Sequence, residues 1–178
     1  MTETKLKTTR SKNRRRIYFI TLNGMIAALY VVFTAPFANF AFGPIQFRLA
    51  EVLAVLPIFS ARTIPGVTLG CFIANLLNPN PHPIDLIFGP VATLLAGIFS
   101  WLIGKKNKPL GIIPPIVMNG LIVGGYLPFI LLDEGSQVTI QAVGISMLSV
   151  AGSEAVLLVV LGIPLIILIS KTRIKDIL

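Results

Sequence analysis

The sequence is poor in charge and in the residues that most enzyme and metal sites use. Only 12% of its 178 residues are charged, whereas a soluble domain usually carries about 25%. Cys71 is the single cysteine and His82 the single histidine, which excludes a disulfide within the chain and the several spaced ligands of a metal site. We find no glycine-rich phosphate loop, no Gly-x-Ser-x-Gly and no His-Glu-x-x-His. The sequence therefore predicts no metal, no bound cofactor and no enzyme.

Apolar residues, by contrast, are in excess. They make up 54% of the chain, and the mean hydropathy is +0.86. A helix needs about 20 predominantly apolar residues to cross a bilayer. Six apolar segments can be placed, at about 17–38, 47–60, 65–77, 84–103, 115–132 and 138–170. We predict an all-α, multi-pass protein of the cell membrane with six transmembrane helices.

The second and third of these segments are shorter than a full span, and each abuts a proline, Pro57 or Pro65. They form either full helices packed against their neighbours or a broken pair buried inside the bundle. The predicted organisation is a six-helix transmembrane domain over 17–170 between two basic tails, at 1–16 and 171–178.

The basic residues are concentrated at the ends of the apolar segments. Lys and Arg number 15 against 7 Asp and Glu, and the formal net charge is +8. On a soluble protein this excess would indicate nucleic acid as a partner. If the N-terminus is inside, every Lys and Arg except Arg48 falls on the cytoplasmic side, as the positive-inside rule requires. We therefore predict cytoplasmic termini, an external Asp133–Gln137 loop and contacts with anionic lipid headgroups, with no nucleic acid bound.

Polar residues within the segments gather near one depth. At 1.5 Å of rise per residue, Glu154 lies about 25 Å from the inner end of its segment, in the outer third of a hydrocarbon core of about 30 Å. An acidic residue inside an apolar run usually faces a polar cavity. The same count places further polar side chains near the outer face, namely Arg48, Glu51, Asn75 and Asp85, with Asn119 nearer the middle. This shared depth favours an outward-facing pocket.

These residues also have purely structural interpretations. Arg48 and Glu51 are three residues apart and can pair on a helix. Asp85 suits the positive end of a helix that begins there, and Asn75 can cap the end of the third segment. Asn119 can hydrogen-bond between helices. In the first segment, the small residues Gly24 and Ala28 allow close approach of another helix, either within the chain or from a partner.

Several stretches resemble the QueT-type family of substrate-binding S-components of energy-coupling factor (ECF) transporters. The resemblance is carried by Gln46-Phe-Arg-Leu-Ala-Glu-Val-Leu53, by Asn75–Asn78 with Phe88–Ala96, by Asn119–Gly124, and by Glu154 with Leu161–Leu165. The family tends to have glycine directly before the acidic residue of its last helix, where this chain has Ser153 after Gly152.

The resemblance implies a six-helix S-component bundle that takes up a queuosine precursor, an aminomethyl deazaguanine base. Its partners would be a membrane T-component, docked at Gly24 and Ala28, and two cytoplasmic ATPase subunits that use the ATP. The candidate substrate-binding residues are Glu154, Glu51, Arg48, Asp85, Asn75, Asn119, Phe47 and Tyr126. Phe47 or Tyr126 would stack on the base or lie over its ammonium group. The alternatives are an S-component for another vitamin or nucleobase, an intramembrane enzyme, and an assembly protein without a ligand.

Overall fold

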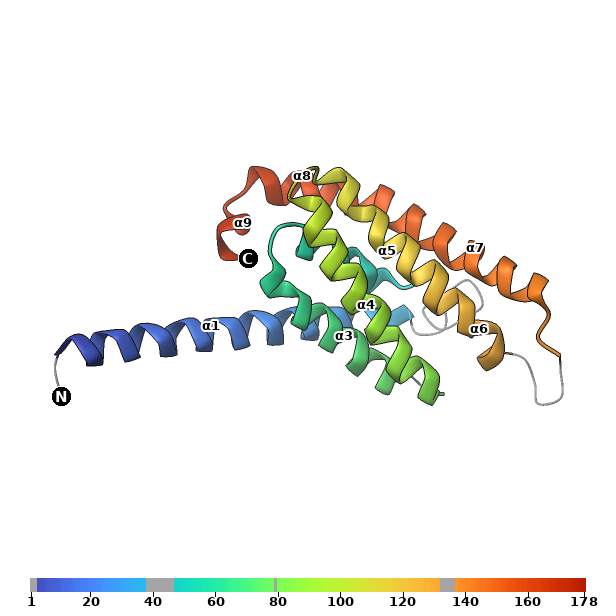
Figure 1. Cartoon of the computed structure of the whole chain (residues 1–178), viewed down its shortest axis with the longest axis horizontal. Coiled ribbons are helices and arrows are strands. Elements are labelled where there is room, and N and C mark those ends of the chain that lie inside the picture. Colours follow the sequence, from blue (N-terminus) through green and yellow to red (C-terminus); the bar gives the residue numbers. More distant parts are fainter. Residues whose placement is uncertain (1–2, 38–46, 79, 132–136) are drawn as a thin grey trace.

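A computed structural model describes residues 3–37, 47–78, 80–131 and 137–178. Those ranges contain helices and no β-strand (Figure 1). Four helical stretches are long and apolar enough to cross a membrane: Lys12–Phe37, Pro83–Gly104, Pro109–Leu131 and Ile140–Lys171. The predicted all-α, multi-pass membrane architecture is confirmed, while six spans and the orientation of the termini stay predictions.

Helix α1 (Glu3–Thr34) is continued by the short 3-10 helix η1 (Ala35–Phe37). Its N-terminal part extends away from the other helices (Figure 1). The described part of the predicted basic tail, residues 3–16, is therefore helical and runs without a break into the first apolar segment. The helix itself gives no boundary at residue 17, so that domain limit also stays a prediction.

The second apolar segment is a 3-10 helix, η2 (Leu49–Ile58), in the middle of the molecule. All of its residues from Ala50 to Ile58 are buried, and it contacts α1, α3, α4 and α7. A 3-10 run of this length is unusual, because its hydrogen bonds are poorer than those of an α-helix. Of the two interpretations of this segment, η2 matches the one in which it is buried inside the bundle.

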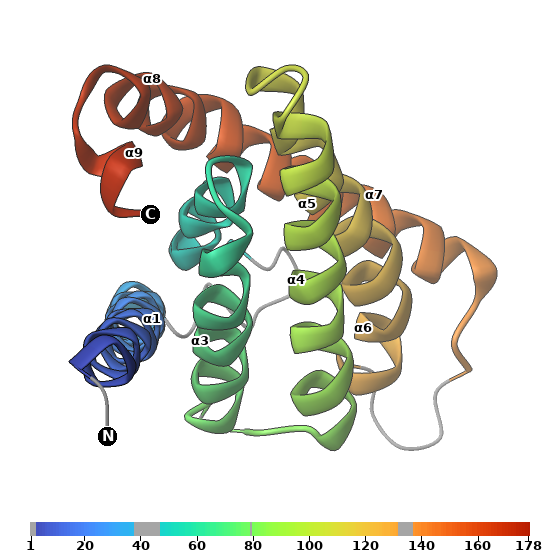
Figure 2. The ribbon, with the colours of Figure 1, turned by 60° about the vertical axis from the view of Figure 1, so that its left-hand side comes forward.

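The first, third and fourth segments form helices that lie side by side in the order α1, α3, α4 (Figure 2). After η3 (Ala61–Thr63), α3 (Ile64–Leu76) packs between α1 and α4. Gly70 permits the contact with α1, since a Cβ there would lie 2.5 Å from the Cβ of Tyr30. This close approach turns Tyr30 of α1 toward η2.

Helix α4 (Pro83–Gly104) begins where its sequence supplies both a cap and a proline. The Nδ1 atom of His82 accepts a hydrogen bond of 3.3 Å from the backbone N–H of Ile84, and Pro83 occupies a position whose N–H would have no helical partner. Asp85 therefore falls in the first turn, at the positive end of the helix dipole. This prediction is confirmed.

The last two long spans are each interrupted by a π-turn. The fifth comprises η4 (Pro109–Ile112), α5 (Ile113–Met118), the π-helical η5 (Asn119–Val123) and α6 (Gly124–Leu131). The sixth comprises α7 (Ile140–Leu157), the π-helical η6 (Leu158–Gly162) and α8 (Ile163–Lys171), and the short α9 (Ile174–Ile177) follows. Gly124 lets η5 and α6 pack directly on α7, because a Cβ there would lie 2.5 Å from the Cα of Met147. The loop predicted to be external lies, except for Gln137, outside the described residues.

Candidate functional site

Three buried carboxylates meet one buried arginine where η2, α3, α4, η5 and α7 converge. We call this cluster the carboxylate site; it comprises Arg48, Glu51, Asp85, Glu154, Asn75 and Asn119, and none is more than 6% exposed. Four of them, Arg48, Glu51, Asn119 and Glu154, line a cavity of about 10 Å³, which is room for about one water molecule, whereas Asp85 and Asn75 do not line it. The cavity is lined by Arg48, Glu51, Cys71, Gly89, Thr93, Asn119, Val123, Val150 and Glu154.

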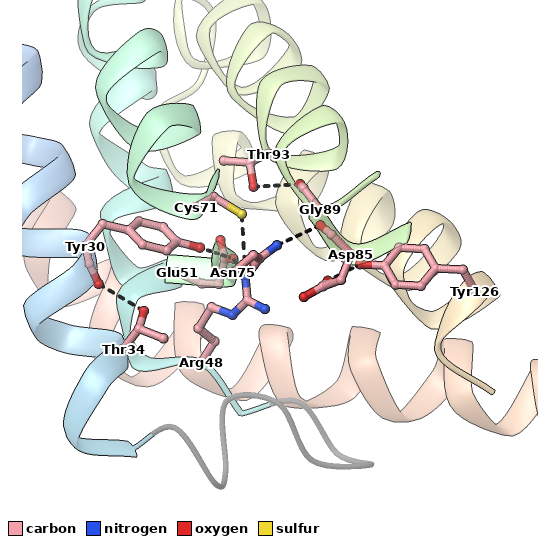
Figure 3. Close-up of polar contacts among 10 residues, drawn as sticks. All are labelled: Tyr30, Thr34, Arg48, Glu51, Cys71, Asn75, Asp85, Gly89, Thr93 and Tyr126. Carbon is pink, nitrogen blue, oxygen red and sulfur yellow. Dashed lines mark hydrogen bonds and ion pairs between the residues drawn. The ribbon is translucent and has the colours of Figure 1, made fainter. Parts of the chain in front are cut away.

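The central segment η2 supplies the first charged pair. Arg48 is the residue just before η2 and Glu51 lies in its first turn, and their Nη1 and Oε1 atoms are 4.0 Å apart. The predicted i, i+3 pairing is thus confirmed. The hydroxyl of Tyr30 donates a 2.5 Å hydrogen bond to the same Oε1 atom, and Nη1 of Arg48 donates to the Sγ of Cys71 at 3.5 Å (Figure 3). Glu51 is therefore held by a side chain of α1 as well as by Arg48.

Asp85 is tied to two other helices. The hydroxyl of Tyr126, on α6, donates a 2.5 Å hydrogen bond to its Oδ1, and Nδ2 of Asn75, on α3, donates to its backbone carbonyl at 2.8 Å (Figure 3). Asn75 thus bridges α3 to α4, and the expectation that it caps its own helix is wrong. Gly89, one turn further along α4, leaves room for this bridge, because a Cβ there would lie 2.5 Å from Nδ2 of Asn75.

Glu154 is the least satisfied acid of the site. It is 5% exposed, and its Oε1 atom has no hydrogen-bond partner among the described residues. The side chain of Asn119 on η5 lies within hydrogen-bonding reach of the Glu154 carboxyl group. A buried carboxylate oxygen without a donor is costly. Glu154 therefore presents a strong acceptor to the cavity.

Two predicted residues lie differently from the others. Phe47 is 38% exposed and does not line the cavity, so the structure does not bring it to the carboxylate site. Tyr126 does not line the cavity either, but it reaches the site through Asp85, and its ring lies 6.2 Å from that of Phe88. The two proposed docking residues, Gly24 and Ala28, are exposed, and a Cβ on Gly24 would meet nothing within 4 Å. Packing within the chain, one of the two alternatives for this pair, is therefore not what the structure shows.

Sequence reasoning missed Tyr30 and Thr93 and assigned Cys71 only a packing role. Tyr30 carries no signal of its own, since an aromatic residue in an apolar span is ordinary packing. Its role follows from Gly70 on α3 and from the position of Glu51, which together show only in three dimensions. Thr93 lines the cavity, and its hydroxyl donates back to the carbonyl of Gly89 at 3.1 Å.

The charge of the site determines what it can bind. If Glu51 and Arg48 neutralise each other, Asp85 and Glu154 leave the site with a surplus of negative charge among its described groups. Ionised carboxylates only accept hydrogen bonds, and one carboxylate can accept two adjacent N–H donors. A cationic nitrogen would form a stronger, charge-assisted bond with another. These carboxylates therefore favour groups that donate N–H hydrogen bonds and disfavour anions.

Comparison with known sequences now identifies the family. Residues 20–171 match the sequence model of the family described as QueT transporter. The chain belongs to the QueT transporter family. A similar relative is the protein named Queuosine precursor transporter QueT from Lactococcus lactis subsp. cremoris (strain MG1363), which is 36% identical over 84 residues. This match covers 46% of the present chain and 48% of the relative, about half the length of each. No solved structure matches the chain.

Membership in the QueT family confirms the resemblance carried by the sequence motifs. The match begins within α1 and ends at the last residue of α8, so it includes every residue of the carboxylate site. This member of the QueT transporter family has several helices long and apolar enough to cross a membrane, and its buried acids lie within the matched region.

Proposed function

We propose that the chain is the substrate-binding S-component of an ECF-type importer and that it binds a queuosine precursor, the aminomethyl deazaguanine base. The relative's printed name supports the substrate, and the acidity of the carboxylate site supports it independently. The observation that carries the proposal is Glu154, an almost fully buried acid beside the cavity whose Oε1 atom has no hydrogen-bond partner in the described part of the chain.

The chemistry of the base fits this site group by group. The guanine-like edge offers adjacent N–H donors, which the carboxylate of Glu154 accepts together. The protonated aminomethyl group binds a second carboxylate by a charge-assisted hydrogen bond. Because the cavity holds about one water molecule, the lining side chains must separate to admit a base. Binding is therefore accompanied by movement of the helices that carry them.

The proposal extends to topology and partners. The short segments η2 and α3 are counted as two of six transmembrane segments, and both termini lie in the cytoplasm. A membrane T-component docks on the exposed Gly24 and Ala28 of α1. Two cytoplasmic ATPase subunits supply the energy, so ATP is used by the partners and this chain holds no cofactor.

Calorimetric titration of the purified subunit tests the substrate assignment. Glu154→Gln keeps the size of the side chain but replaces an acceptor oxygen by a donor. We expect it to weaken binding of the aminomethyl deazaguanine base by about 2 kcal/mol, or roughly 30-fold, the scale of a hydrogen bond to a charged group. The same substitution at Glu3, at the start of α1, is the control and should leave affinity unchanged.

Two results would contradict the proposal. Unchanged affinity in a folded Glu154→Gln protein removes Glu154 from the site. Tight binding of an anionic vitamin to the wild-type subunit overturns the ligand assignment. Thermal unfolding of each variant in the same detergent shows whether it is folded, so a loss of binding is not confused with a loss of structure.

A further inference from the structure

A second hollow lies along the middle of α1, on the N-terminal side of Tyr30. Its volume is about 740 Å³, within the usual range of ligand pockets of about 300–1,000 Å³. We call it the arginine groove; it is lined by Arg14, Arg15, Arg16, Tyr18, Phe19, Leu22 and Arg62. Neither the proposed substrate nor the proposed partner contacts account for it.

The groove has a charged end and an apolar end because of helix periodicity. Arg15, Tyr18, Phe19 and Leu22 are spaced i, i+3, i+4 and i+7, so they share one face of α1. The guanidinium group of Arg15 is thus followed along the helix by two aromatic rings and a leucine. Arg62, just before α3, closes the other side where α1 and α3 pack together.

The positive charge of the groove has no counter-charge among the described side chains. The three acids whose side chains the structure describes, Glu51, Asp85 and Glu154, all belong to the carboxylate site. The hydroxyl of Tyr18 donates to the backbone carbonyl of Ile177, so the C-terminal segment borders the groove. Four arginines therefore line a space that has no acidic partner among the described side chains, and such a space favours an anion.

The shape and chemistry together define that anion. A guanidinium group binds a phosphate oxygen pair in a bidentate manner and is less strongly hydrated than an ammonium group. A small soluble ion would contact the arginines but not the aromatic and aliphatic residues that follow them along the helix. These residues suit acyl chains, and α1 becomes apolar from Ile17 onward, so the groove spans the boundary between headgroup and hydrocarbon.

We propose that the arginine groove binds one anionic phospholipid, with its phosphate among the four guanidinium groups and its acyl chains along Tyr18, Phe19 and Leu22. The lipid links α1 to the start of α3 by bridging Arg15 and Arg62. Anionic lipids are enriched in the cytoplasmic leaflet, so the location agrees with a cytoplasmic N-terminus.

Native mass spectrometry of the full-length protein in detergent tests the proposal. The protein is titrated with dioleoyl phosphatidylglycerol and, separately, with dioleoyl phosphatidylcholine. We expect one phosphatidylglycerol adduct that is retained at collision energies that remove the others, and no comparable phosphatidylcholine adduct. The double variant Arg15→Gln, Arg62→Gln should reduce that adduct at least about fivefold. The control Lys106→Gln, Lys171→Gln removes the same charge from exposed positions outside the groove and should retain the adduct.

Two further arms separate a lipid site from a general anion site. Phe19→Ala, which keeps all four arginines, should weaken binding of the dioleoyl lipid, whereas excess inorganic phosphate should displace it only weakly. Thermal unfolding of each variant confirms that it is folded. Equal losses in the groove and control variants, equal retention of phosphatidylcholine, or full displacement by inorganic phosphate would each overturn the proposal.

Discussion

The hydroxyl of Tyr30 on α1 donates a 2.5 Å hydrogen bond to the carboxylate of Glu51 in η2. Tyr30 is fully buried, so this contact links the first helix directly to the centre of the bundle. It also fixes the acid that pairs with Arg48. The helix proposed to dock the T-component thus contacts the carboxylate site through the side chain of Tyr30.

Removing that hydroxyl should destabilise the protein. Tyr30→Phe leaves a buried carboxylate oxygen of Glu51 without its donor, at an expected cost of about 1–3 kcal/mol in the free energy of unfolding. Tyr18→Phe is the matched control, since Tyr18 is 43% exposed and its hydroxyl bonds only a backbone carbonyl at the surface. Reversible unfolding in mixed detergent measures both. Equal stabilities of the two variants would show that the Tyr30 bond contributes nothing.

A second prediction concerns the glycine that leaves room for the Asn75 bridge. Gly89→Ala places a Cβ 2.5 Å from Nδ2 of Asn75, and the resulting displacement should break the bond to the Asp85 carbonyl. We expect a loss of about 1–3 kcal/mol, the scale of overpacking in a core. Gly152→Ala is the control, because a Cβ there meets nothing within 4 Å and should instead gain helix propensity. A Gly89→Ala protein as stable as the control would contradict the close contact.

The proposed docking face gives a prediction that separates binding from transport. Gly24→Leu and Ala28→Leu enlarge exposed positions of α1 and should block close approach of another helix. The isolated subunit should bind the base with wild-type affinity, while uptake by cells with the complete transporter should be lost. Met25→Leu, an exposed position of the same helix with little change in size, is the control. Normal uptake by both enlarged variants would rule out this face as the docking surface.

The charge distribution predicts a topology that labelling can check. In a Cys71→Ser background, a single cysteine is placed at Gln137, before α7, or at Asn107, after α4; both positions are exposed. An impermeant thiol reagent applied to intact cells should label Gln137→Cys and leave Asn107→Cys unlabelled until the cells are opened. The reverse pattern would invert the proposed orientation.

Much of the fold could be predicted because membrane spans have a strong composition signal. The fourth and sixth segments were placed within two residues of the observed spans. The fifth was expected to start at Pro115, but the helical stretch begins at Pro109 with the 3-10 helix η4, and Pro114 and Pro115 lie in the first turn of α5. Neither the 3-10 form of η2 nor the π-turns η5 and η6 could be foreseen, because an apolar segment has the same composition signal in all three helical forms.

The candidate site, like the fold, could be predicted from the sequence only in part. The acids, Arg48 and both asparagines were found because polar residues in apolar segments are costly and therefore conspicuous. Tyr30 and Thr93 were missed because nothing distinguishes them from packing residues until their neighbours are known. Phe47 was included as a ring that could stack on the base, but the backbone at Arg48 is extended and Phe47 lies at the surface.

The order in which the carboxylate site receives its charges has a consequence for the biogenesis of the protein. During synthesis Arg48 and Glu51 emerge together and can enter the bilayer as each other's counter-charge. Asp85 follows with α4, and Glu154 comes only with α7, near the end of the chain. The centre of the nascent bundle is therefore neutral until α4 brings in Asp85, and its second surplus negative charge is added only when α7 brings in Glu154.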